Sequence, residues 1–149
     1  MSPINLTAEA YTIPFQGHEL HARVFRPAAP AIGRIFYLHG GGLVFGEPDD
    51  LPLCYVNLFL NAGYELISLD YPLAPEQRLA VILGMLEILE HGAGSADSST
   101  ETDSASGASH IPYYLFGRSA GAYLALMEAK RLCESGLGAA GLLCFYGYH

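Results

Sequence analysis

Residues 113–126 decide the fold, and they read Tyr113-Tyr114-Leu115-Phe116-Gly117-Arg118-Ser119-Ala120-Gly121-Ala122-Tyr123-Leu124-Ala125-Leu126. An aromatic and aliphatic run with strand propensity comes first, and an Ala/Leu-rich run with helix propensity comes last. The Gly-x-Ser-x-Gly sequence between them predicts a sharp turn from strand to helix. Glycines at 117 and 121 suit such a turn, because a Cβ atom at either site would clash where strand and helix approach each other.

Ser119 occupies the centre of this turn. Its hydroxyl would project at the start of a helix, where free amides and the helix dipole favour developing negative charge. A serine held in a strained turn at such a place is typical of a catalytic nucleophile. Ser119 is therefore the candidate nucleophile, with Gly117 and Gly121 supporting the turn.

Strand and helix patterns alternate along the rest of the chain. Alternating polar and apolar residues predict an antiparallel hairpin from segments 11–15 and 20–26, and apolar runs predict strands at 34–38, 64–69 and 139–146. Helices are expected at about 51–62, 76–90 and 120–134. Strands that alternate with helices imply parallel βαβ units. The predicted fold class is α/β, a doubly wound and mostly parallel sheet led by an antiparallel hairpin, in one domain spanning residues 1–149.

A second glycine-rich turn, His39-Gly40-Gly41-Gly42, follows the strand at 34–38. Both glycine turns fall at corresponding ends of parallel strands, where open α/β sheets place ligands. In acyl transfer, one amide aimed at the developing oxyanion can contribute about 3–4 kcal/mol. The amides of Gly41, Gly42 and Ala120 are the candidate donors, and His39 and Gly40 are expected to support the loop.

Three motifs in this order resemble the hormone-sensitive-lipase-like carboxylesterase group of α/β-hydrolases: His39-Gly40-Gly41-Gly42, Asp70-Tyr71-Pro72-Leu73-Ala74-Pro75-Glu76 and Gly117-Arg118-Ser119-Ala120-Gly121. The resemblance runs from about residue 11 to residue 146. It implies a serine esterase that acts on short or medium acyl esters, with a small-molecule ester as its partner. No cofactor is expected, because the glycines after residue 39 match neither the dinucleotide fingerprint nor a phosphate loop.

The sequence departs from this group at three positions. Pro72 stands where the group usually has Arg, Arg118 where it has Asp, and Ala122 where it often has a second Gly. Arg118 places a positive charge beside the candidate nucleophile. This charge would either favour an acidic substrate or pair with a neighbouring carboxylate.

The acid and the histidine of a catalytic triad are not found after Ser119, although this fold orders them Ser, Asp or Glu, then His. Only Glu134, on a helix, follows as an acid, and His149 is the one later histidine. The chain thus looks truncated before both residues. His149 could approach Ser119 from the last strand, whereas Asp70 resembles the structural aspartate of the group.

Two functional hypotheses follow. In the first, the protein is a serine carboxylesterase whose full chain supplies the missing acid and base. In the second, it is a hydrolase-fold binding protein or an inactive truncated remnant, since a fold does not fix a function. The presence of Ser119 and the glycine loop favours the esterase hypothesis. The absence of a general base favours the binding protein or the inactive remnant.

Composition excludes several other classes. Seven Lys and Arg against 15 Asp and Glu give a net charge of −8, which argues against nucleic acid as a partner. We expect no metal site, because His18 and His21 would point to opposite faces of a hairpin. Three cysteines in apolar segments suggest core residues of a reducing compartment, and no segment resembles a leader or a membrane span, so a cytoplasmic location is expected.

Two further segments carry expectations. Residues 92–110 contain no aromatic and no large aliphatic side chain, which predicts a mobile low-complexity surface loop rather than a lid for acyl chains. The run Gly141-Leu142-Leu143-Cys144-Phe145-Tyr146 has the composition of an interior strand but would lie at the sheet edge. We expect the chain to aggregate or to self-associate through this last strand.

Overall fold

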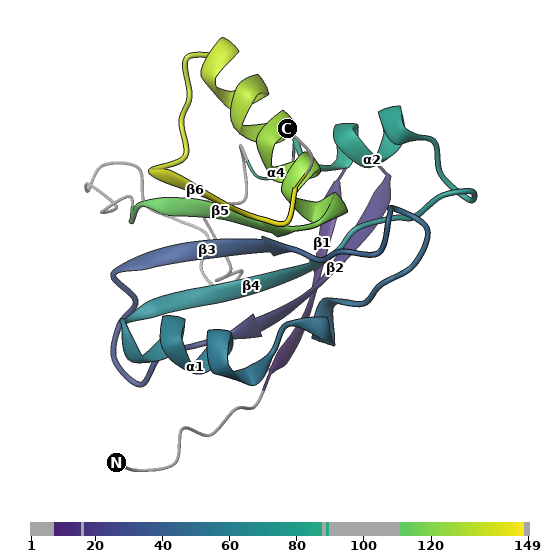
Figure 1. The fold of residues 1–149 in the computed structure, drawn as a ribbon. Coiled ribbons are helices and arrows are strands. Elements are labelled where there is room, and N and C mark those ends of the chain that lie inside the picture. The colour runs from purple at the N-terminus through teal and green to yellow at the C-terminus, as the bar shows by residue number, and fades with distance from the viewer. Residues whose placement is uncertain (1–7, 16, 88, 90–110, 148–149) are drawn as a thin grey trace.

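The protein is described by a computed structural model that defines residues 8–15, 17–87, 89 and 111–147. Six strands form one sheet in the order β1-β2-β4-β3-β5-β6 (Figure 1). Their bounds are β1 Glu9–Phe15, β2 His18–Phe25, β3 Gly33–Leu38, β4 Tyr64–Asp70, β5 Tyr113–Arg118 and β6 Gly141–Phe145. The neighbouring strands β4, β3, β5 and β6 pair in parallel. Strand β2 pairs antiparallel to β1 on one side and to β4 on the other. The predicted sheet is confirmed.

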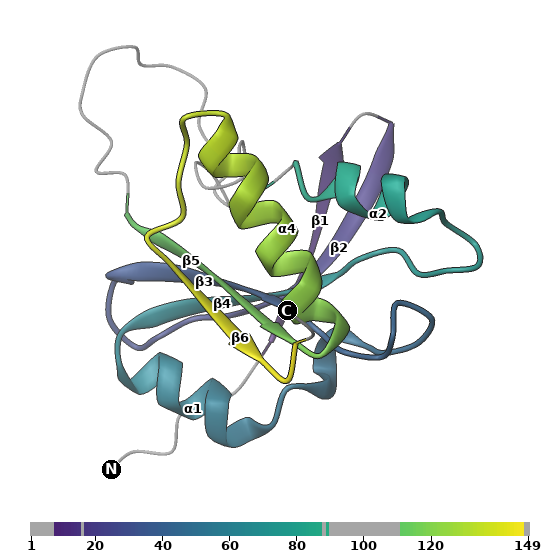
Figure 2. The same ribbon diagram turned by 45° about the horizontal axis from the view of Figure 1, so that its top comes forward.

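Helices cover both faces of the sheet. Helix α1 (Leu53–Asn61) lies on one face, and helices α2 (Leu79–Met85) and α4 (Ala120–Glu134) lie on the other, as Figures 1 and 2 both show. A short 3-10 helix, η1 (Pro48–Asp50), precedes α1. The turn before α4 and the loop after β3 therefore lie at the same end of the sheet, where the parallel strands β3 and β5 have their carboxyl ends.

The sheet separates two hydrophobic clusters because successive side chains of a strand point to opposite faces. Along β3, Phe36 and Leu38 join the cluster beneath α2 and α4, while Ile35 and Tyr37 join the cluster beneath α1. Each fully buried large apolar side chain contributes on the order of 1.5–3 kcal/mol. The alternation explains why β3 is apolar throughout: it is covered on both faces.

The hairpin is held to the sheet by polar contacts as well as by its apolar face. Arg26 forms an ion pair with Glu9 and a second one, at 3.2 Å, with the buried Glu65 of β4. Arg34 at the start of β3 also donates to Glu65, at 2.8 Å. The Glu65 carboxylate therefore links the hairpin to two central strands.

Helix α2 is shorter than the 76–90 helix that periodicity predicts. The Gln77 amide donates to the Leu73 carbonyl at 2.9 Å, which closes a turn, and Arg78 is extended at φ −80° and ψ 152°. These two features prevent a helix from beginning before Leu79. Bonds from Leu86 to Leu83 and from Glu87 to Gly84 then tighten the chain after Met85 into i→i−3 turns.

The structure also bears on the predictions made for the three cysteines. Cys54 and Cys133 are exposed and Cys144 is partly buried, so their assignment to the core was wrong. The first two lie in the first turn of α1 and the last turn of α4, on the solvent side, because an apolar neighbourhood in sequence does not fix which face a residue takes.

The loop predicted at 92–110 lies outside the described residues. Every helix within the described ranges is too short or too polar to cross a bilayer.

Candidate active site

Ser119 lies between β5 and α4 in a backbone conformation that side chains rarely adopt. Its φ is 53° and its ψ is −120°, and Ala120 begins the helix immediately after it. The Ser119 amide donates to the carbonyl of Phe145 at 2.7 Å, which ties the turn to β6. A non-glycine residue held in such a region stores about 1–3 kcal/mol of strain, which the surrounding structure must offset.

Gly117 and Gly121 permit the close approach that produces this turn. A Cβ atom at Gly117 would lie 2.5 Å from the Ala122 amide nitrogen, and one at Gly121 would lie 2.5 Å from the carbonyl oxygen of His39. Both obstacles are backbone atoms, which cannot rotate away as side chains do. Helix α4 therefore packs its first turn directly on the end of β3, and only glycine fits at either position.

The loop after β3 turns sharply at its glycines. Gly41, Gly42 and Leu43 all have positive φ, at 114°, 63° and 68°. The amides of Val44 and Phe45 donate to the Gly41 carbonyl at 3.1 Å, which folds the loop back on itself. Among the described residues, the amides of Gly41 and Gly42 themselves have no backbone acceptor.

This loop and the serine turn come together at one edge of the sheet. A Cβ atom at Gly40 would lie 3.3 Å from the Arg118 carbonyl oxygen and 3.4 Å from the Cβ of Ser119. Gly40 thus contacts the serine turn directly. The Ala120 amide, as the first of helix α4, has no intrahelical acceptor either. The structure therefore brings the loop that contains Gly41 and Gly42 against the serine turn through Gly40, and the role of their amides and that of Ala120 as oxyanion donors stays a prediction.

The buried side chain of His39 supports the glycine loop. The ring is fully buried, its Nδ1 lies 2.7 Å from the Gly40 carbonyl oxygen, and it stacks on Tyr71 with ring centroids 4.2 Å apart. Its carbonyl accepts a hydrogen bond of 2.6 Å from the Tyr71 hydroxyl. Burial raises the pKa of Tyr71, and the charge of Asp50 raises it further, so this hydroxyl stays a donor across the physiological pH range.

Tyr71 and Ala74 are parts of the site that sequence reasoning did not single out. The amide of Ala74 donates to the Leu43 carbonyl at 2.7 Å, so the segment after β4 fixes the glycine loop from its far side. The resemblance marked this segment as a motif and gave Asp70 a structural role, but it gave none to Tyr71 or Ala74. Its place at the end of β4, next to β3 in the sheet, is the signal that could have found them.

Arg118 contacts a polar network on the α1 face of the sheet. Its guanidinium lies 3.5 Å from the Tyr37 hydroxyl and 3.4 Å from the Asp50 carbonyl oxygen. Tyr37 in turn donates to the Asp50 carboxylate at 2.8 Å. Burial opposes the charge of Arg118, but the contact with the Tyr37 hydroxyl and the nearby Asp50 carboxylate raise its pKa. Arg118 thus contacts the Tyr37 hydroxyl and the Asp50 backbone, and neither predicted role, pairing with a carboxylate or recognition of an acidic substrate, is decided by these contacts.

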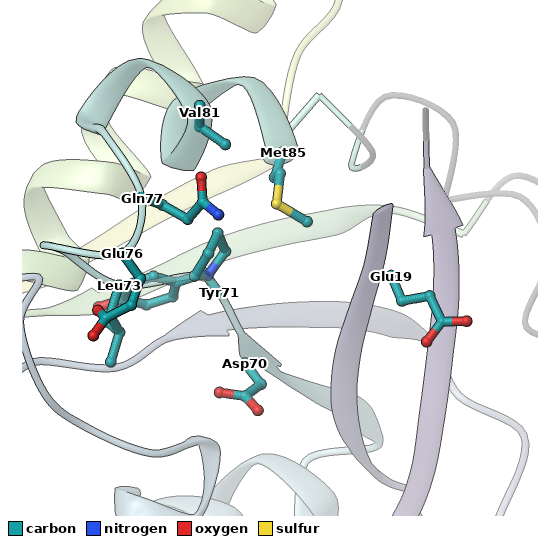
Figure 3. A pocket seen from close by; sticks show the side chains of 9 residues that line it. Glu19, Asp70, Tyr71, Leu73, Glu76, Gln77, Val81 and Met85 are labelled. Atoms are coloured by element: carbon teal, nitrogen blue, oxygen red, sulfur yellow. The ribbon is translucent and has the colours of Figure 1, made fainter. Parts of the chain in front are cut away.

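Described residues line, among others, a surface hollow beside Tyr71 and one beside the hairpin, and Ser119 lines neither of these two. The larger of the two has a volume of about 440 Å³ and is lined by Tyr71, Leu73 and one side of α2, with the carboxylates of Glu19, Asp70 and Glu76 around it (Figure 3). The smaller, of about 390 Å³, lies between the hairpin and η1. The larger hollow borders Tyr71, the residue that braces His39.

Among the described residues, no histidine or carboxylate forms a hydrogen bond with the Ser119 hydroxyl. His21 lies 3.1 Å from Thr12 in the hairpin. The Nδ1 of His39 lies against the Gly40 carbonyl oxygen, whereas its buried Nε2 has no hydrogen-bond partner among the described residues. Asp70 is exposed at the end of β4, and Glu134 is exposed in the last turn of α4. His149 and residues 90–110 lie outside the described residues. Within the described ranges, no three His, Cys, Asp or Glu side chains gather as a metal-binding group.

The sheet, its helices on both faces and the serine turn define an α/β-hydrolase arrangement. Residues 35–148 match the family model of the alpha/beta hydrolase fold, and the chain therefore belongs to that family. The predicted fold class and the resemblance to esterases of this fold are both confirmed.

Solved structures agree with this assignment. An alpha/beta hydrolase superfamily protein from Enterococcus faecalis is 29% identical, with a TM-score of 0.78 over 96% of this chain and 48% of its own. A hyperthermophilic esterase from the archaeon Pyrobaculum calidifontis is 26% identical, with a TM-score of 0.79 over 98% of this chain and 45% of its own. A Staphylococcus aureus protein of unknown function is 32% identical, with a TM-score of 0.73 over 94% and 46%. The chain thus spans about half the length of the structures it matches.

Proposed function

We propose that the whole protein is a carboxylesterase in which Ser119 is the nucleophile. The observation that carries this proposal is the conformation of Ser119: a non-glycine residue at φ 53° and ψ −120°, with Gly40 of the glycine loop against it. A protein that only binds a ligand gains nothing from a serine strained in this way.

In ester cleavage, each part of the proposed site has a role. The hydroxyl of Ser119 attacks the ester carbonyl, and the amides of Gly41, Gly42 and Ala120 stabilise the oxyanion that forms. His39, Gly40, Gly117 and Gly121 hold these groups in place. The proton of Ser119 passes to a general base that lies outside the described residues.

Three further observations support an ester as the substrate. The family model and the esterase from Pyrobaculum calidifontis point to acyl transfer. The amides of Gly41 and Gly42 have no backbone acceptor among the described residues, which suits donors to a carbonyl oxygen that gains charge. Among the described residues the site holds no cluster of cations that would bind a phosphate, since Arg118 is engaged by Tyr37 and Asp50.

Hydrolysis of p-nitrophenyl esters of increasing acyl length by the full-length, folded protein tests the proposal. We expect the highest kcat/KM with acyl chains of about two to eight carbons, as the resemblance implies, and a loss of about 10⁴-fold or more in Ser119→Ala. The matched control is Ser135→Ala, an exposed serine at the end of α4. Equal turnover by the parent and Ser119→Ala would reject the proposal. Absence of turnover in the folded full-length protein would favour the binding-protein alternative.

A further inference from the structure

Arg118 contacts the segment that follows β3 twice, once through its backbone and once through its side chain. It is the last residue of β5 and directly precedes Ser119. Its carbonyl oxygen would lie 3.3 Å from a Cβ atom at Gly40, so its backbone closely approaches the start of the glycine loop. Its guanidinium lies 3.4 Å from the carbonyl oxygen of Asp50 in η1. One residue beside the candidate nucleophile therefore contacts both ends of segment 40–50.

The segment between these two contacts is folded as one unit. The carbonyl of Gly41 accepts two amide hydrogen bonds from within the loop. Gly46 packs on the buried His39 ring, because a Cβ atom at Gly46 would lie 2.8 Å from the ring carbon Cε1. The Asp50 amide then donates to the Glu47 carbonyl at 3.1 Å, which closes η1. Since η1 follows Gly46 after a single residue, a shift of η1 also moves the loop that contains Gly41.

Tyr37 completes the contact between Arg118 and η1. Its side chain is fully buried, and its hydroxyl accepts from the guanidinium at 3.5 Å and donates to the Asp50 carboxylate at 2.8 Å. Asp50 is therefore held at its carboxylate by Tyr37 and at its carbonyl by Arg118. Both guanidinium contacts are long, so their strength rests on the positive charge of a partly buried side chain. Removal of that charge should release η1 from the serine turn.

We propose that Arg118 is a positioning residue for ester cleavage, an inference that rests on the proposed function of Ser119. Its guanidinium holds η1, and with it the amides of Gly41 and Gly42, against the serine turn. In this role Arg118 acts through the glycine loop and not on the substrate. Its loss therefore slows the turnover of neutral and acidic esters alike, whereas loss of a residue that recognises an acidic substrate weakens the binding of acidic esters alone.

Steady-state hydrolysis of p-nitrophenyl hexanoate and mono-p-nitrophenyl adipate by the full-length protein tests this role. The two esters have acyl chains of equal length and differ by a terminal carboxylate. We expect Arg118→Met to lower kcat about tenfold on both, with KM changed less than about threefold. Arg118→Lys keeps a cationic donor and should stay within about threefold of the parent. Arg78→Met removes the same charge from an exposed arginine before α2 and is the control. An unchanged kcat in Arg118→Met, or a rise in KM confined to the adipate ester, overturns the proposal.

Hydrogen–deuterium exchange of the same proteins follows the loop without relying on turnover. We expect peptides from segment 40–50 to exchange faster in Arg118→Met than in the parent and in Arg78→Met, while peptides from β3 exchange alike in all three. This change in a parent that hydrolyses no ester would support the contact of Arg118 with the loop and contradict the proposed function. Equal exchange of segment 40–50 in all three proteins, or faster exchange spread over the whole sheet, overturns the positioning role whatever the activity.

Discussion

Replacing Gly121 with alanine lowers the free energy of unfolding by about 3 kcal/mol, at the upper end of the usual cost of overpacking. The added Cβ would lie 2.5 Å from the His39 carbonyl oxygen and 2.6 Å from the Leu38 carbonyl carbon. Relief requires the first turn of α4 to move away from β3. That movement separates Ala120 from the glycine loop, so reactivity at Ser119 falls together with stability.

Urea denaturation followed by circular dichroism measures this effect. Gly138→Ala is the control, because a Cβ atom at Gly138 meets nothing within 4 Å and the residue lacks a positive φ. We expect this control to remain within about 0.5 kcal/mol of the parent. If Gly121→Ala and Gly138→Ala were equally stable, the close packing of α4 on β3 would not be what positions Ser119.

Replacing Ser119 with glycine should stabilise the protein while removing its reactivity. Glycine adopts φ 53° and ψ −120° without strain, so the change relieves about 1–3 kcal/mol. The greater freedom of glycine in the unfolded chain offsets about 0.4–1 kcal/mol of this gain. We therefore expect a net increase of about 1 kcal/mol in the free energy of unfolding.

Two variants separate strain from other causes. Ser119→Ala keeps the Cβ atom and hence the strain, and should stay close to the parent in stability. Ser135→Gly removes a side chain at φ −82°, where no strain exists, and should not stabilise the chain. A Ser119→Gly protein less stable than Ser119→Ala would mean that the turn is not strained, and the main structural argument for the nucleophile would fail.

The fold could be predicted from the sequence because local patterns and long-range packing agree. The apolar strands β3, β4 and β5 and the glycine-bounded helix α4 all appear where periodicity and turn residues place them. Helix α2 was predicted to begin at residue 76, before the hydrophobic spacing that starts at Leu79, whereas the backbone at Gln77 and Arg78 forms a turn and an extended residue. Periodicity reports which face is buried, and it does not report where hydrogen bonding begins.

The glycines of the site and the supporting place of His39 were predictable from the sequence, but the contacts of Tyr71 and Ala74 were not. The need for glycine at 117 and 121 follows from the sharpness of the turn, and the structure bears out the clashes that a Cβ atom would cause. The stacking of Tyr71 on His39 and the bond from Ala74 to Leu43 depend on the order of strands in the sheet. No local sequence pattern encodes a contact between segments 32 residues apart.

The central claim is that Ser119 is an activated nucleophile, and reaction with a fluorophosphonate probe tests it most directly. The folded full-length protein is treated with the probe, and the modified peptide is located by tandem mass spectrometry beside Ser119→Ala. We predict a single adduct on Ser119 and none in the variant. Failure to form an adduct in the folded protein, or an adduct that persists in Ser119→Ala, would contradict the claim.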